Sequence, residues 1–201
     1  MTAFATAYAA RPATWLVDER GERVRLPLGR WHGPAEPSLR TLLDRCAGPA
    51  LDVGCGPGRA AAELASRGLV ALGIDTCPAA VRLARRRGAA ALRRSVFAPL
   101  PGEGRWAHAL LLDGNIGIGG DPVALLRRCA QVLRPGGTVL VEVDAPGAGL
   151  WRGSARLLPG PAFAWARVGV EAVGPVAARA GLTLRAVSEH DGRWFAELAR
   201  P

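Results

Sequence analysis

The sequence predicts an α/β protein whose central sheet is mostly parallel, ends in an antiparallel hairpin and carries helices on both faces. Three observations predict this fold class. From residue 50 onward, short apolar segments alternate with helical segments, as in parallel strands joined by helices. A glycine-rich turn joins the first of these strands to the first helix. The last two apolar segments flank Asp191-Gly192, a strong hairpin signal, so the final strands should be antiparallel.

Residues 1–48 lack the regular alternation of strands and helices that follows, and they are predicted to form an N-terminal lid or brace. Short strands are expected at 14–17 and 23–26, around a turn that contains glycine. Ser38 is expected to cap a following helix, because leucines recur after it at helical spacing.

Residues 49–201 are predicted to form a single domain. Strands are expected at 50–53, 69–74, 90–93, 108–112, 137–143, 182–189 and 193–199, and helices at 58–67, 78–87, 121–133 and 168–180. Asp121 and Pro122 are typical of a helix start, with an N-cap followed by proline at the first helical position. The segment 145–167 is rich in Pro, Gly and Trp, and we expect a long substrate-side loop there.

The composition is that of a globular protein, and its positive charge does not by itself indicate a nucleic-acid partner. The chain has 201 residues, 49% of them hydrophobic and 21% charged, which suits one folded core. A formal charge of +9 would ordinarily suggest nucleic acid as a partner. All 26 basic residues are arginine, however, and they are scattered, which points to the base composition of a GC-rich gene. Nucleic acid is therefore not the expected partner.

The four cysteines and the apolar segments indicate a cytoplasmic protein. The cysteines form no CxxC pair and no zinc-like spacing with histidine, so no metal is expected. No apolar run approaches the roughly 18 residues of a membrane span, and the N-terminus does not resemble an export signal. We expect no membrane association, and a monomer or homodimer.

The glycine turn at residues 51–58 is suited to a nucleotide-like cofactor. Its glycines let the backbone turn sharply and approach a ligand, and the following helix offers free N–H groups. Asp75, at the end of the second strand, can accept from two ribose hydroxyls. A dinucleotide fingerprint would need a third glycine where Arg59 stands. Asp52, ahead of the turn, would repel a pyrophosphate but suits an ammonium group.

These segments resemble the class I methyltransferases that depend on S-adenosylmethionine (SAM). Residues 51–59 resemble motif I of that family, Gly73-Ile74-Asp75 resembles motif II, and 132–140 is similar to the family's "LkPGG" turn before strand five. The motifs cover about residues 48–143, and the remainder is similar in element order. The resemblance implies a Rossmann-like methyltransferase sandwich with a seven-stranded sheet and SAM as the cofactor.

The resemblance also implies a set of cofactor contacts. Gly54, Cys55 and Gly56 would line the methionine part of SAM, Asp52 would support its amino group, and Asp75 would hold the ribose. Further contacts are expected from Thr76, Ser95, Val96, Asp113 and Gly114. The family often has Gly-Asp-Ala or Gly-Asp-Val after strand three, where this chain has Arg94-Ser95-Val96. The adenine contact there departs from the family pattern.

The methyl acceptor should lie beyond the carboxyl ends of the strands. Asp113 is a candidate for orienting the acceptor or contacting SAM, although an Asp before Gly also starts turns. His32 is the candidate general base, since the pKa of an unperturbed histidine lies near neutrality; a surface histidine is the alternative. Acceptor contacts are expected from Trp31, Asn115, Asp144, Trp151 and Arg152, although the aromatic and arginine side chains of 145–167 also suit ordinary lid packing.

The function expected from these residues is methyl transfer from SAM to a small-molecule acceptor at oxygen, nitrogen or carbon. Members of the family that methylate DNA bases carry Asn/Asp-Pro-Pro-aromatic where this chain reads Asp-Gly-Asn-Ile at 113–116, and no Pro-Cys pair occurs there. An RNA or protein methyltransferase is one alternative, supported only by the charge. A SAM-binding regulator or inactive partner subunit is another.

Overall fold

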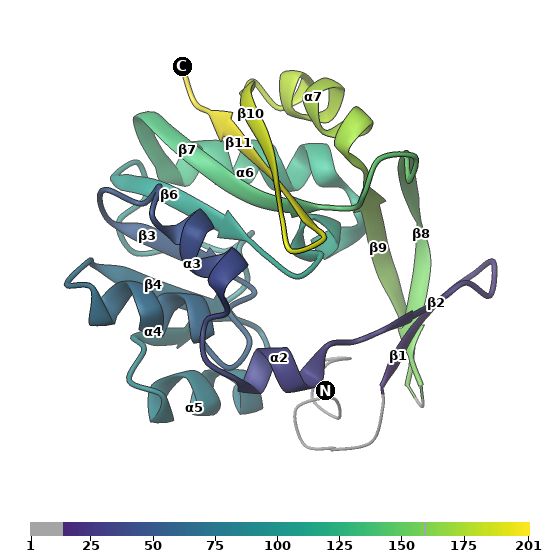
Figure 1. Cartoon of the computed structure of the whole chain (residues 1–201), viewed down its shortest axis with the longest axis horizontal. Coiled ribbons are helices and arrows are strands. Elements are labelled where there is room, and N and C mark those ends of the chain that lie inside the picture. Colours follow the sequence, from purple (N-terminus) through teal and green to yellow (C-terminus); the bar gives the residue numbers. More distant parts are fainter. Residues whose placement is uncertain (1–13, 159) are drawn as a thin grey trace.

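The computed structural model describes residues 14–158 and 160–201, which form two sheets and their covering helices (Figure 1). The larger sheet has seven strands in the order β10-β11-β7-β6-β3-β4-β5. Their bounds are β3 Ala50–Val53, β4 Ala71–Asp75, β5 Ala91–Arg93, β6 Trp106–Leu111, β7 Leu133–Val143, β10 Thr183–His190 and β11 Arg193–Ala199. The smaller sheet has the order β2-β1-β8-β9, with β1 Trp15–Asp18, β2 Arg23–Arg25, β8 Leu150–Leu157 and β9 Ala162–Val168.

The pairing in the larger sheet confirms the predicted fold class. Strands β5, β4, β3, β6 and β7 pair in parallel, whereas β11 pairs antiparallel with both β7 and β10. The hairpin turn is the expected one: Asp191 and Gly192 both have positive φ, 53° and 74°, and His190 pairs with Arg193. Two positive φ values are what a tight two-residue hairpin turn requires.

Helices cover both faces of the larger sheet, and each face has its own core. One core joins β3, β6 and β7 to α6 (Pro122–Val132) and α7 (Val170–Arg179). On the other face pack α3 (Pro37–Leu43), α4 (Arg59–Ser66) and α5 (Pro78–Arg86). Helix α6 starts as predicted, because the Asp121 carboxylate accepts from the N–H groups of Val123 and Ala124, both at 3.1 Å.

The prediction of a long loop at 145–167 is wrong. This segment contains β8 and most of β9, which form an antiparallel hairpin, and β8 also pairs with β1. Glycine and proline content favoured a loop, but β8 and β9 pair with each other along their length and β1 adds a further strand from far away in the sequence. The smaller sheet stands to one side of the larger one (Figure 1).

The predicted N-terminal segment is correct in its strands and wrong in its helix cap. Helix α3 begins at Pro37, after Glu36, so that Ser38 lies buried inside the helix instead of capping it. Proline suits the first helical position, and its φ sets the start of the helix. A short helix that the sequence did not reveal, α2 (Leu28–His32), precedes it. The part of the predicted brace before residue 14 lies outside the described residues.

Candidate active site

A cavity of about 760 Å³ lies at the carboxyl ends of β3, β4, β6 and β7, where the ligand crevice of an α/β sheet is expected. Residues after these strands form one side of it. The smaller sheet and α2 form the other side, with side chains from β1, β2 and β9. The volume is that of a small-molecule site, which spans about 300–1,000 Å³ in proteins.

The glycine turn after β3 lines one end of the cavity. Gly54, Gly56 and Gly58 have φ values of +69°, +52° and +79°, which side chains other than glycine rarely adopt. At Gly54 a Cβ would also lie 2.7 Å from the amide nitrogen of Asn115. That amide donates to the carbonyl oxygens of Val53 and Gly54, both at 2.9 Å. Asn115, expected to contact the acceptor, thus fixes the glycine turn through its amide group.

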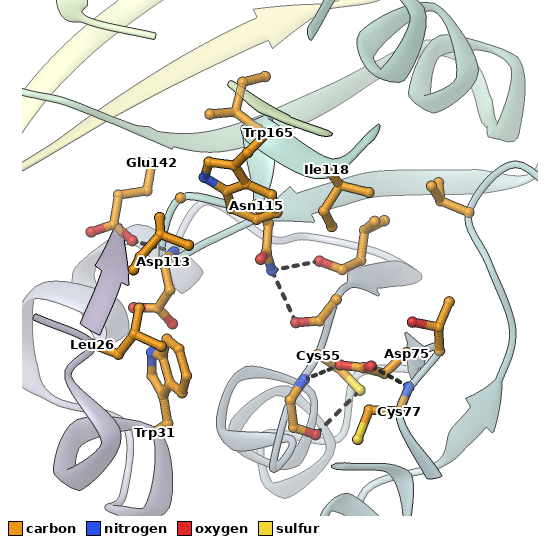
Figure 2. A pocket seen from close by; sticks show the side chains of 18 of the residues that line it. Leu26, Trp31, Cys55, Asp75, Cys77, Asp113, Asn115, Ile118, Glu142 and Trp165 are labelled. Atoms are coloured by element: carbon orange, nitrogen blue, oxygen red, sulfur yellow. Dashed lines mark hydrogen bonds between the residues drawn. The ribbon is translucent and has the colours of Figure 1, made fainter. Parts of the chain in front are cut away.

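Asp75 lines the same end and is tied to the turn (Figure 2). Its carboxylate accepts from the N–H of Gly56 at 3.0 Å and from the N–H of Cys77 at 2.8 Å. Burial raises the pKa of Asp75, and the backbone N–H groups oppose that rise without cancelling it. The cavity is also lined here by other predicted cofactor residues: Cys55, Thr76, Ser95, Val96 and Gly114. The Ser95 hydroxyl accepts from the N–H of Phe97 at 3.3 Å.

Asp52 occupies a different position from the one the resemblance implies. It is buried in β3, is not among the residues that line the cavity, and accepts a hydrogen bond from the N–H of Ala61 in α4. Burial raises its pKa from 3.8 to about 7, although the charge of Arg59 lowers it. Since Gly58 offers no capping side chain, Asp52 caps α4 from the neighbouring strand.

Asp113 is the centre of a buried network of charges at the other end of the cavity. Its carboxylate contacts the guanidinium groups of Arg59 at 2.5 Å, Arg30 at 3.0 Å and Arg193 at 3.5 Å. Burial alone would raise the pKa of Asp113. The three arginine charges outweigh that effect and hold this pKa below its ordinary value. Asp113 is therefore an ionised, firmly held group and a weak base.

Two glutamates complete the network. Glu36 pairs with both Arg59 and Arg193. Glu142 accepts from Arg193 at 2.9 and 2.6 Å, and from the backbone N–H of Asp113 at 2.6 Å. Three arginines thus balance three carboxylates, from the N-terminal segment, the start of α4, the ends of β6 and β7, and the C-terminal hairpin. This network leaves no signal in the sequence, because its partners are up to 157 positions apart.

The remaining predicted residues divide between the cavity and other places. Trp31 lines the cavity, as does Asp144, which pairs with Arg167 at 3.0 Å. Trp151 is buried in the apolar cluster of the smaller sheet, and Arg152 pairs with Asp121 at 3.1 Å; neither lines the cavity. His32 is exposed and also lies outside it, with its carbonyl oxygen bound by Arg87.

Phe163 and Trp165 line the cavity in the segment where Trp151 and Arg152 were expected to do so. Alternation along β9 would have paired them on one face, had the segment been recognised as a strand. Within residues 14–158 and 160–201, no group of three or more His, Cys, Asp or Glu is arranged to hold a metal ion.

Known proteins share both a domain and the fold with this chain. Residues 50–137 match the family model described as "Methyltransferase domain". A SAM-dependent methyltransferase from Bacteroides fragilis, solved with S-adenosyl-L-homocysteine, superposes with a TM-score of 0.76 at 23% identity, over 99% of this chain and 93% of that one. Residues 50–137 are thus a methyltransferase domain, and the chain has the fold of SAM-dependent methyltransferases. The predicted methyltransferase activity and SAM cofactor are confirmed.

Two further similar structures carry small molecules. The Burkholderia thailandensis 1,6-didemethyltoxoflavin-N1-methyltransferase, with that compound bound, has a TM-score of 0.62 at 18% identity, over 83% of this chain and 77% of that one. An O-methyltransferase from neocarzinostatin biosynthesis, with 1,4-dihydroxy-2-naphthoic acid bound, has a TM-score of 0.60 at 25% identity. The match covers 77% of this methyltransferase and 49% of that one.

Proposed function

We propose that this methyltransferase acts on a small-molecule acceptor and not on RNA or protein. The observation that carries the proposal is the cavity itself, which holds the cofactor residues at one end and is walled by the smaller sheet and α2 at the other. The two similar structures that contain a compound besides S-adenosylhomocysteine, from Burkholderia thailandensis and from neocarzinostatin biosynthesis, both hold a small molecule. The charge of +9 is the feature that favours RNA. In the described residues no helix is long and apolar enough to cross a membrane.

The residues at the glycine turn fit SAM. The positive φ values leave the backbone open to close approach by a ligand, and the Asp75 carboxylate is placed for the ribose hydroxyls. When bound, SAM supplies an electrophilic methyl group on a sulfonium.

The chain's own contribution is alignment and exclusion of water. The arginines around Asp113 keep it ionised and fixed, so it orients a ligand instead of taking a proton. Asn115 holds the turn after β3 in place. We propose that residues 1–48 act as the brace of residues 49–201, since Glu36 and Arg30 join the charge network and β1 extends the smaller sheet.

The first test is calorimetric binding of S-adenosylhomocysteine to the full chain. Asp75→Asn should weaken binding by about tenfold, because one carboxylate oxygen becomes a donor. Asp44→Asn, at an exposed carboxylate outside the cavity, should leave it unchanged. Equal affinity of the Asp75→Asn variant and the wild type would refute the cofactor assignment.

The second test is transfer of labelled methyl from SAM into candidate acceptors. Incorporation into small molecules is expected, with none into bulk RNA or protein. Labelling of RNA or protein alone would reverse the proposal. Tight SAM binding without transfer to any acceptor would favour the regulator or partner-subunit alternative.

A further inference from the structure

The inner face of the smaller sheet is an aromatic wall of the cavity. Along β9, Phe163, Trp165 and Arg167 alternate onto one face, and all three line the cavity. The rings of Phe163 and Trp165 meet edge to face, with centroids 5.7 Å apart and planes at 88°. Directly opposite Trp165 in β8 is Gly153, a residue without a side chain. Trp165 belongs to a buried apolar cluster with Leu16, Trp151, Ala155 and Leu157, so the wall is firmly packed.

This wall is held at a fixed position relative to Asp113. The chain passes from Asp113 into the short helix η1 (Asn115–Gly120), which packs against β9. At Gly117 a Cβ would collide with the carbonyl oxygen of Ala166 and lie 2.7 Å from the Trp165 ring. Such close contact leaves no freedom for β9 to slide along η1. The wall is therefore part of the site and is placed to contact an acceptor.

A second tryptophan lines the cavity from outside this sheet. Trp31 comes from α2, whereas Leu26, just before α2, packs against the apolar cluster of the wall. In Figure 2, Trp31 and Trp165 lie on opposite sides of Asp113 and Asn115. Flat surfaces on two sides favour a ligand that is itself flat, because both of its faces then make close contact.

The charges of the site disfavour a cationic acceptor. Three carboxylates of the cavity are already in ion pairs. Asp113 pairs with Arg30 and Arg59, Glu142 pairs with Arg193, and Asp144 pairs with Arg167. These carboxylates are already compensated, whereas the Nε of Arg30 is a buried donor with no hydrogen-bond partner among the described residues. An electron-rich acceptor is also what an electrophilic methyl donor requires.

We infer that the methyl acceptor is a flat aromatic molecule, neutral or anionic, whose ring lies between Trp165 with Phe163 on one side and Trp31 on the other. The inference rests on the function proposed above and names its substrate class. Trp165 is then the residue that selects an aromatic ring over a saturated one.

Calorimetry on the full chain saturated with S-adenosylhomocysteine tests this with three probes of one bicyclic frame. The probes are 2-naphthoic acid, its saturated counterpart decahydro-2-naphthoic acid, and the cation 2-naphthylmethylamine. We expect 2-naphthoic acid to bind at least about tenfold more tightly than either other probe. Comparable or tighter binding of the saturated or cationic probe would overturn the inference, as would failure of all three to bind.

Substitutions in the aromatic wall test whether Trp165 is responsible for the preference for an aromatic ring. Trp165→Ala should weaken 2-naphthoic acid by about tenfold, Trp165→Phe should recover most of that affinity, and both should bind S-adenosylhomocysteine as the wild type does. Trp15→Ala, at an exposed tryptophan of the same sheet that does not line the cavity, is the matched control and should change neither affinity. Unchanged 2-naphthoic acid affinity in Trp165→Ala overturns the role of the wall. Failure of the wild type to bind S-adenosylhomocysteine would instead refute the proposed function.

Discussion

The two ends of the cavity are built in different ways. The cofactor end comes mainly from one continuous stretch, residues 53–77, in which a glycine turn and Asp75 are joined by hydrogen bonds, with Ser95 and Val96 beside it. The acceptor end is assembled from segments around 16–31, 113–119, 142–144 and 163–167. Binding of a shared cofactor thus depends on short-range sequence, whereas acceptor choice depends on contacts between distant segments.

The same contrast appears in the two buried aspartates. Asp52 at the cofactor end is compensated mainly by one N–H group and the charge of Arg59, and burial raises its pKa to about 7. Asp113 at the acceptor end has three arginines around it, and its pKa is lowered. Burial raises the pKa of both aspartates, but only at Asp113 do the surrounding positive charges outweigh it.

The largest expected effect comes from breaking the charge network of the acceptor end. Arg193→Met should lower the free energy of unfolding by about 3 kcal/mol, because it removes the arginine that pairs with the part-buried Glu142 and one of the two arginines that pair with Glu36. Urea unfolding measures this. Arg185→Met, at a half-exposed arginine of the same hairpin, should cost less than about 0.5 kcal/mol. Similar losses in the two variants would contradict the importance of the network.

Next in size is an effect confined to the cofactor end. Gly54→Ala should raise the Kd of S-adenosylhomocysteine by about 100-fold, because the new Cβ meets the Asn115 amide and strains a positive φ. Calorimetry measures the change. Gly68→Ala has a similar φ of +78° with no atom within 4 Å of its Cβ, so it controls for strain alone. We expect that control to bind as the wild type does.

A smaller effect should appear at the join between β9 and η1. Gly117→Ala should raise amide hydrogen exchange in β9 by about tenfold, since the Cβ collides with the Ala166 carbonyl oxygen. Exchange in β3 and β4 should stay unchanged, because these strands do not contact Gly117. Gly29→Ala, with no atom within 4 Å of its Cβ, is the control. Equally faster amide hydrogen exchange in both sheets would mean that the two ends of the cavity do not respond independently.

The smallest expected effect is a change in the free energy of unfolding with each pH unit. Asp52 has a raised pKa in the folded state, so its ionisation opposes folding as pH rises from about 4 to about 7. The stability of Asp52→Asn relative to the wild type should therefore increase over that range, by up to about 1 kcal/mol per pH unit. Asp113→Asn should show the opposite sign: the contribution of the Asp113 charge is present above pH 4 and lost in acid. Unfolding curves from pH 2 to 8 would show whether the two variants differ in this way.

The sequence was a good guide wherever structure is set by neighbours along the chain. The glycine turn, the Asp121 cap and the Asp191-Gly192 hairpin each depend on a few adjacent residues, and each occurs as expected. Segment 145–167 was misjudged, because its glycine and proline content outweighed the strand pattern of β8 and β9, which pair with each other and, through β8, with β1. Asp52 was given a position at the ligand, whereas the structure uses it to cap a helix.

The sequence by itself determined the α/β fold, the methyltransferase domain and the cofactor end of the cavity. These follow from hydrophobic period, turn chemistry and spacing, all of which are local properties. Only the tertiary structure decided which arginines surround Asp113, and that Phe163 and Trp165 form the cavity wall while Trp151 and Arg152 lie outside it. Charge pairing and strand pairing between distant segments leave no periodic trace in the chain, since either partner alone is an ordinary arginine, glutamate or tryptophan.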